Sequence, residues 1–178
     1  MIKKIVSAIA VILFSHCVTA SDTSDGTVRS FYPDNHFSIE FPIDWQLIKG
    51  EEEVVIVAVA PSGDILHGSR NSVIISSAYK ENYAYNQKQR FSTYLNSIEQ
   101  FDGECKVLDT GELITEYNEK MIWVIYTQQR EKFFSKNMTF VFVKEDYQYI
   151  IGCYTEASTF EQYKLLFNQI AASFQFEK

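Results

Sequence analysis

The first predicted element is a strand in which hydrophobic and polar positions alternate. Phe37, Ile39 and Phe41 are separated by single polar residues, which is typical of a strand with one buried face. The run Pro33-Asp34-Asn35 before them has turn chemistry, so residues 28–32 are predicted to form the other arm of a hairpin. The folded part of the chain is therefore predicted to begin with a β-hairpin.

Later hydrophobic runs show no alternation. The longest are residues 54–59, 121–126 and 140–143, and shorter ones lie at residues 73–75 and 149–151. A strand that is apolar on both sides is typical of the centre of a sheet, where both faces are covered. The short polar segment Lys144-Glu145-Asp146 joins two of these runs, which predicts that they pair as antiparallel neighbours.

Two segments have the three- and four-residue spacing of amphipathic helices. The first is predicted from about Gln87 to Gln100, with Asp102-Gly103 as its stop. Its apolar stripe consists of Phe91, Tyr94, Leu95, Ile98 and Phe101. The second begins at Ser158-Thr159-Phe160-Glu161, the pattern of a capping box in which serine and glutamate satisfy each other's exposed amides. Its stripe consists of Phe160, Tyr163, Leu166, Phe167, Ile170 and Phe174.

These elements predict an α+β fold in the order four strands, a helix, four strands and a helix. Two amphipathic helices and a mostly antiparallel sheet with an apolar centre fit together when one helix covers each face. We therefore expect a three-layer α/β/α sandwich, formed as a single domain by residues 28–178. Residues 21–27 are polar and lack periodicity, and we expect them to form a flexible leader.

Residues 1–20 have the three parts of a secretory signal peptide. Two lysines precede an apolar stretch of 10 residues, and small residues lead up to Ala20. We expect cleavage after Ala20 and a periplasmic or secreted mature chain. The alternative is lipidation at Cys17, which would anchor the protein, but His16 beside that cysteine suits the lipoprotein peptidase poorly. The apolar stretch is too short for a membrane span, which needs about 20 residues.

The charge of the chain narrows the classes of partner. The full sequence has a formal charge of −7, and loss of the two lysines in the signal peptide makes it −9. Its basic residues are scattered along the sequence rather than clustered. This distribution argues against binding to nucleic acid or to an anionic membrane surface.

Two cysteines, Cys105 and Cys153, remain after the expected cleavage. An oxidising compartment favours a disulfide between them. If two strands of a meander separate them, however, their backbones lie about 14 Å apart, beyond the limit of about 7 Å for a disulfide. The sequence leaves two alternatives, a disulfide or a pair of buried thiols that pack as small apolar groups.

Residues 37–45, Phe-Ser-Ile-Glu-Phe-Pro-Ile-Asp-Trp, resemble the opening strand of the PsbP-type fold family. That family is named for an extrinsic subunit of photosystem II and includes the Ran-binding Mog proteins and small exported bacterial proteins such as DcrB. The alternation of strand pairs with single helices and the closing helix that runs into residues 170–174 extend the resemblance over residues 27–176. This resemblance implies an accessory or binding protein, because members of the family share no catalytic residues. It does not imply a photosystem role or a metal site for this chain.

Few residues of the sequence indicate chemistry. His36 and His67 have no second ligand at close spacing, and Glu51-Glu52-Glu53 would point to alternate sides of an extended backbone, so neither predicts a metal site. Cys153 lies inside a predicted strand, unlike a catalytic thiol. No phosphate loop, nucleophile elbow or zinc-binding helix motif occurs. We therefore predict no catalytic residue, no metal and no cofactor.

The one candidate surface is a polar connection with three tyrosines, Tyr79, Tyr83 and Tyr85. Tyrosine is enriched at binding surfaces because it offers a rigid apolar ring with a polar tip. Trp45, in contrast, is expected in the core. Our first hypothesis is a non-catalytic module that binds an envelope protein. The alternative is a periplasmic carrier of a small ligand or lipid, suggested by an aromatic content of 15%; an enzyme is the third choice.

Overall fold

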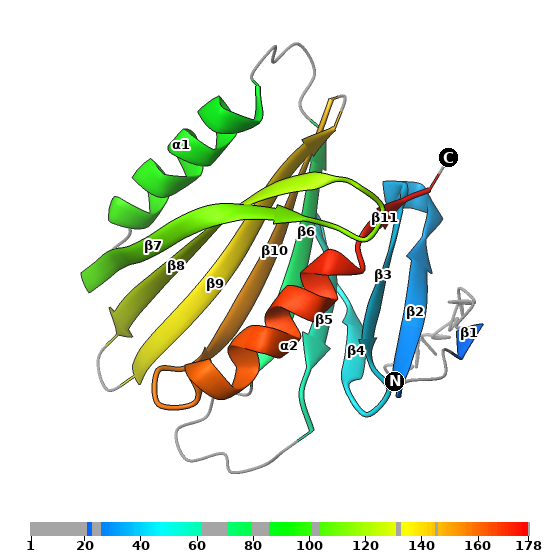
Figure 1. The fold of residues 1–178 in the computed structure, drawn as a ribbon, viewed down its shortest axis with the longest axis horizontal. Helices are drawn as coiled ribbons and strands as arrows, with labels where there is room; N and C mark the ends of the chain where they lie inside the picture. Colours follow the sequence, from blue (N-terminus) through cyan, green and yellow to red (C-terminus); the bar gives the residue numbers. More distant parts are fainter. Residues whose placement is uncertain are drawn as a thin grey trace, which may run out of the picture.

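The computed structural model describes residues 21–22, 26–61, 71–79, 86–100, 104–130, 133–144 and 146–177. The expected signal peptide, Cys17 and the cleavage site at Ala20 lie outside these residues. Along the chain, the elements are β1 (Ser21–Asp22), β2 (Thr27–Tyr32), the 3-10 turn Pro33–Asn35, β3 (Phe37–Pro42), β4 (Gln46–Lys49), β5 (Val54–Val59), β6 (Ser72–Tyr79), α1 (Gln87–Glu99), β7 (Glu104–Ile114), β8 (Lys120–Arg130), β9 (Phe133–Lys144), β10 (Tyr147–Glu156), α2 (Phe160–Ala172) and β11 (Gln175–Phe176) (Figure 1). Strands β1 and β2 both include residues of the expected leader.

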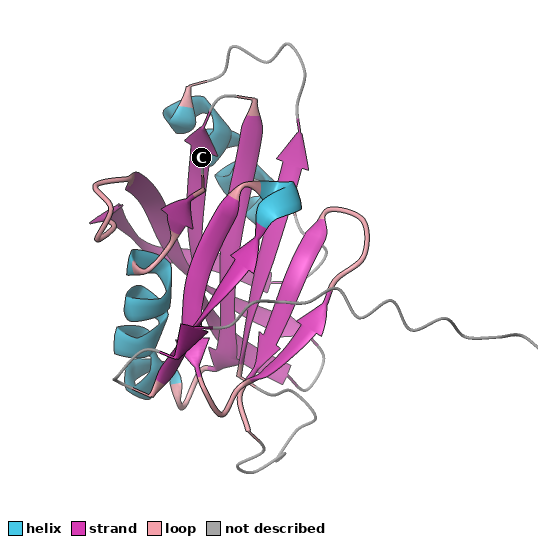
Figure 2. Cartoon of the chain, turned by 90° about the vertical axis from the view of Figure 1, so that its right-hand side faces the viewer, coloured by secondary structure: helices cyan, strands magenta, loops and turns pink. Residues whose placement is uncertain are grey.

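The strands form two antiparallel sheets. The larger has the order β4-β5-β6-β10-β9-β8-β7, and the smaller has the order β1-β2-β3-β11. The predicted hairpin is β2–β3, with Phe41 opposite Val28, and the predicted antiparallel neighbours are β9 and β10. Strands predominate in the molecule, with two α-helices packed against them (Figure 2). The α+β class and the mostly antiparallel pairing are therefore confirmed.

Neighbouring side chains of the central strands enter two different cores. On β9, Phe140 belongs to the larger core with Phe167 of α2, whereas Val141 belongs to a smaller core with Phe91 and Ile98 of α1. Because side chains alternate along a strand, α1 and α2 pack against residues that point in opposite directions from the sheet. Strands β8 and β9 are therefore buried on both faces, which explains why their apolar runs show no alternation.

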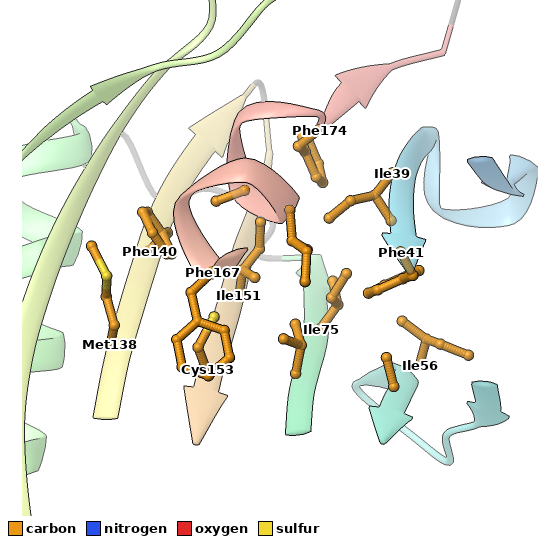
Figure 3. Close-up of a cluster of buried hydrophobic side chains, with 14 of the residues drawn as sticks. Ile39, Phe41, Ile56, Ile75, Met138, Phe140, Ile151, Cys153, Phe167 and Phe174 are labelled. Carbon is orange, nitrogen blue, oxygen red and sulfur yellow. The ribbon is translucent and has the colours of Figure 1, made fainter. Parts of the chain in front are cut away.

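The expectation of a single sheet between two helices requires a correction. β3 contributes Phe37, Ile39 and Phe41 to the same core as α2, and it belongs to the smaller sheet. Figure 3 shows Ile39 and Phe41 pointing toward the side chains around Phe167. The alternating pattern of β3 gives this strand one buried face. The side chains of that face pack beside α2, and β3 does not become a further strand of the larger sheet. Trp45 is also buried in this core, as predicted.

The first helix begins where the sequence predicted, and the start of the second differs from the prediction. α1 covers Gln87–Glu99, as expected, and starts with a capping box in which Asn86 Oδ1 accepts from the Gln89 amide and Gln89 Oε1 accepts from the Asn86 amide, both at 3.1 Å. The box predicted at Ser158 is wrong, because α2 starts at Phe160 after Thr159 and has no side-chain cap. The Glu161 carboxylate is instead paired with Lys136 Nζ at 2.7 Å.

Candidate functional site

The tyrosine-rich connection predicted as a binding surface begins at the end of β6. Tyr79 is the last residue of that strand and 54% of its side chain is exposed. Tyr83 and Tyr85 lie outside the described residues. The structure therefore places one of the three predicted residues, at the end of the seven-stranded sheet where β10 begins, because Tyr79 is paired with Tyr147.

Two residues that the sequence analysis did not select extend this surface. The Tyr79 ring lies 5.2 Å from the Tyr147 ring, and the Tyr147 ring lies 5.9 Å from the His36 ring in an edge-to-face arrangement. His36 comes from the turn of the β2–β3 hairpin, where it adopts a positive φ of 58°. We call the group Tyr79, Tyr147 and His36 the tyrosine end.

The tyrosine end rests on a buried aromatic stack. Tyr147 contacts Tyr149, whose ring centroid is 5.8 Å from Phe37 and 5.6 Å from Phe174. The Tyr149 hydroxyl donates a hydrogen bond to the Asn35 carbonyl at 2.9 Å, which ties the stack to the hairpin turn. Aromatic rings packed in this way have little side-chain freedom left to lose, so fixing the exposed ring of Tyr79 in a complex would cost little conformational entropy.

A separate feature of the described residues is a pocket of about 280 Å³ beneath α1. The helix contributes Tyr94, Ser97 and Ile98, and the sheet contributes Cys105, Tyr126, Gln128 and Tyr154. The Tyr94 hydroxyl donates to Thr139 Oγ1 of β9 at 3.2 Å. Burial raises the pKa of Tyr126 to about 12 and also raises the pKa of Tyr94. Both phenols are therefore neutral at physiological pH.

These raised pKa values predict that alkali destabilises the fold. An unfolded tyrosine ionises near pH 10, whereas Tyr126 stays neutral in the folded chain to about pH 12. Stability present below pH 10 is therefore lost as the pH rises, by about 1.4 kcal/mol per pH unit for each such tyrosine. Circular dichroism and tyrosinate absorbance, recorded together between pH 9 and 12, check this, with Tyr126→Phe expected to flatten the dependence. Ionisation of every tyrosine near pH 10 with the fold intact would contradict it.

The disulfide that the sequence left open is not formed. Cys105 on β7 and Cys153 on β10 are separated by β8 and β9, and both residues are thiols. Three strand spacings put their backbones about 14 Å apart, too far for a disulfide. Cys153 is fully buried, and burial raises the pKa of its thiol, so it packs as an apolar group in the core. Figure 3 shows it beneath Phe167.

The remaining candidates do not converge on one place. Glu51, Glu52 and Glu53 are exposed in the turn between β4 and β5, and His67 lies outside the described residues. Among the residues that the structure describes, no three His, Cys, Asp or Glu side chains are grouped so that they could hold a metal ion. Within the same residues, neither helix is long and apolar enough to cross a membrane.

Comparisons with known proteins match this chain by structure only. No family model matches it, and no curated protein matches its sequence. The cyanobacterial PsbP of Synechocystis sp. PCC 6803 (CyanoP) aligns with a TM-score of 0.62 and 13% identity, over 88% of this chain and 97% of its own. LpqN, involved in cell envelope biogenesis of Mycobacterium tuberculosis, gives 0.61 and 9% over 90% of each chain. The Ran-binding protein Mog1p of Saccharomyces cerevisiae gives 0.58 and 10% over 84% and 95%.

These alignments show that the chain has the PsbP-like, Mog-type fold. The resemblance suggested by residues 37–45 and by the order of strands and helices is therefore confirmed at the level of the fold. Identities of 9–13% carry no residue-level role from those proteins to this one.

Proposed function

We propose that this protein is an exported, non-catalytic accessory module of the cell envelope that binds a protein partner through the tyrosine end. The observation that carries the proposal is the half-exposed ring of Tyr79, which lies tilted against the Tyr147 ring and is supported by the buried aromatic stack. Partly exposed aromatic side chains on a rigid base are typical of the residues that contribute most to protein binding.

The envelope part of the proposal is supported by the signal-like pattern of residues 1–20 and by the fold. LpqN, which has the same fold, is involved in cell envelope biogenesis. Mog1p, also of this fold, binds the protein Ran, which makes a protein partner a reasonable choice. The expected mature chain begins after Ala20, and the intact mass of the protein recovered from the envelope would distinguish this processing from lipidation at Cys17.

Replacing Tyr79 with alanine is expected to weaken capture of the envelope partner at least 10-fold. Loss of a central aromatic anchor costs about 2 kcal/mol or more in binding, whereas most other contacts cost less than 1 kcal/mol. The matched control is Phe134→Ala, because Phe134 is 48% exposed at the opposite end of the sheet. The measurement is the amount of partner recovered with each tagged variant at equal folded concentration. Equal recovery with both variants would contradict the proposal.

A lipid carrier has less support than a protein-binding module. The pocket beneath α1, at about 280 Å³, is just below the range of about 300–1,000 Å³ that is usual for drug-sized ligands. Five of its seven lining residues carry polar groups typical of a hydrogen-bonding site, namely Tyr94, Ser97, Tyr126, Gln128 and Tyr154. Native mass spectrometry of the purified chain would reveal a co-purified lipid and reverse this preference.

The non-catalytic part of the proposal has its own test. Cys153 is fully buried with a raised pKa, so it is unsuited to act as a nucleophile. We expect no turnover of generic ester, peptide or phosphate substrates by the purified chain above a heat-denatured control. Turnover that follows the folded protein through purification would overturn this part of the proposal and leave the binding test unaffected.

A further inference from the structure

We propose that the side of the seven-stranded sheet that faces α1 has an open half, over β10, β6, β5 and β4, which binds an amphipathic helix of another protein. This surface is separate from the tyrosine end. Ile74 of β6 points toward the α1 side, whereas Tyr79, five residues later, points with the buried Val73 and Ile75 toward the α2 side. The proposal therefore does not depend on the protein-binding function.

Helix α1 covers only the other half of this side of the sheet. It packs against β7, β8 and β9, and its core includes Val124 and Tyr126 of β8 and Val141 of β9. None of the described residues of β10, β6, β5 or β4 belongs to that core. α1 lies near β7 and β8 and away from β4 and β5 (Figure 1). Because α2 packs on the opposite side, neither helix in the described part of the chain covers the open half.

The open half has the composition of a buried surface. Ile74, Val57 and Ile48 lie in register across β6, β5 and β4, and Ile48 is 44% exposed. Strands β5 and β6 contain no charged residue along their whole length. A sheet face that meets water usually carries polar side chains in alternation with the buried ones, and β5 lacks that alternation. Its second apolar face, with the half-buried Val57 and Val59, is therefore typical of a face that is covered in a complex.

The size of the open half fits one helix. Three strand spacings from β10 to β4 give a width of about 14 Å, and the length of β6 from Ser72 to Ala78 is about 20 Å. This footprint of roughly 300 Å² is small beside the about 800 Å² that each partner of a stable dimer buries. A helix with its side chains is about 10–12 Å wide, and about four turns span 20 Å. Neighbouring helices lie about 8–10 Å apart, so a helix beside α1 would lie about two strand spacings away, over β10 and β6.

A second copy of this chain does not complement the open half. Because α1 stands beside it, two such sheets cannot meet face to face, and in a symmetric pair each α1 would lie on the open half of the other copy. The outer side of α1 is polar, with Gln89, Thr93 and Asn96 all exposed. Those side chains would lose water against an apolar surface without gaining hydrogen bonds, which is costly. The occupant that fits is a helix of a different protein, with uncharged apolar side chains at three- and four-residue spacing.

The test uses the full mature chain labelled with nitrogen-15 and an uncharged peptide of about 15 residues, made of leucine, alanine and glutamine with the leucines on one helical face. We expect the peptide to shift the NMR signals of Ile74, Val57 and Ile150 with a Kd on the order of 100 μM. A scrambled peptide of the same composition should bind about 10-fold more weakly or worse, because its leucines share no face. Equal binding of the two peptides, or shifts that lie elsewhere, would overturn the proposal.

A pair of lysine variants locates the site. Ile74→Lys is expected to weaken peptide binding about 10-fold or more, because it places a charge in the centre of the apolar surface. It should move the urea midpoint of unfolding by less than about 1 M, because the lysine amine reaches water where no other segment covers it. The matched control is Leu165→Lys, which should leave binding unchanged, since Leu165 is 69% exposed on α2.

Two results with these variants would refute the site. Equal affinity of the two variants for the peptide would show that the peptide does not bind over Ile74. Failure of Ile74→Lys to fold, with Leu165→Lys folded, would show that the chain itself covers Ile74 and leaves no open half.

Discussion

Phe167→Ala is expected to destabilise the protein by about 3–5 kcal/mol. Phe167 is fully buried on the face of α2 that packs on the seven-stranded sheet, and Figure 3 shows it over Cys153 and Ile151. Its removal leaves a cavity in the core between α2 and the two sheets. Strands on both sides hold the surrounding side chains in place, so they cannot move together to fill the cavity. The measurement is the free energy of unfolding from urea denaturation followed by circular dichroism.

Leu165→Ala is the matched control on the same helix. Leu165 is 69% exposed, so its truncation is expected to change the free energy of unfolding by less than about 0.5 kcal/mol. The difference between the two variants isolates burial from helix propensity, since both replace a large residue with alanine in α2. Similar effects in the two variants would mean that α2 does not present the Phe167 face to the sheet.

Arg29→Met is expected to cost about 2–4 kcal/mol. Arg29 is the centre of a buried network: its guanidinium donates to Glu40 Oε1 at 2.7 Å and to the Ser173 carbonyl at 3.1 Å. These bonds join the β2–β3 hairpin to the end of α2. Removing one partner of a buried ion pair leaves the other charge buried without an opposite charge, which costs about 3–5 kcal/mol of stability when both partners are fully buried. We expect less here because the Glu40 side chain is 24% exposed.

Two further variants separate this effect from a general loss of charge. Lys120→Met removes the cation of the exposed Lys120–Glu112 pair, and a change of at most about 1 kcal/mol is expected. Adding Glu40→Gln to Arg29→Met should recover part of the lost stability, because the unpaired Glu40 carboxylate is replaced by a neutral carboxamide. Urea denaturation of all the variants provides the comparison. A cost for Arg29→Met no larger than for Lys120→Met would show that the network does not hold the hairpin to α2.

The sequence predicted the elements whose patterns arise from burial alone. The helix spacing of Phe91 and Ile98 located α1, and the runs at residues 121–126 and 140–143 located central strands, because most residues covered by protein are apolar. The α+β class follows from those elements. The hydrophobic pattern of each short segment was enough for these predictions.

The parts that the sequence did not predict depend on contacts between distant segments. β4 is short, mostly exposed and at the edge of the sheet, so burial leaves little pattern in residues 46–49. The capping box at Ser158 was wrong because Lys136, 25 residues from Glu161, binds the carboxylate that the box needs. The second sheet includes β11, which pairs with β3 although residues 175–176 are far from residues 37–38 in the sequence.

The candidate surface was partly predictable. Tyr79 was selected because tyrosines cluster near it in sequence, but Tyr147 and His36 reach it only through strand pairing and the position of the hairpin turn. The pocket residues were missed for the same reason. A usable signal existed on β9, where the polar residues Ser135, Asn137 and Thr139 alternate along the strand and are all buried. Buried polar residues in a core strand indicate a special environment.

If the protein functions as proposed, the tyrosine end contacts a protein partner in the envelope. The most direct measurement is site-specific photocrosslinking in intact cells, with a photoreactive phenylalanine analogue at position 79 and, for comparison, at position 134. We expect one dominant crosslinked protein from position 79 and little from position 134, since the two positions lie at opposite ends of the sheet. The same adducts from both positions, or none from position 79, would contradict it.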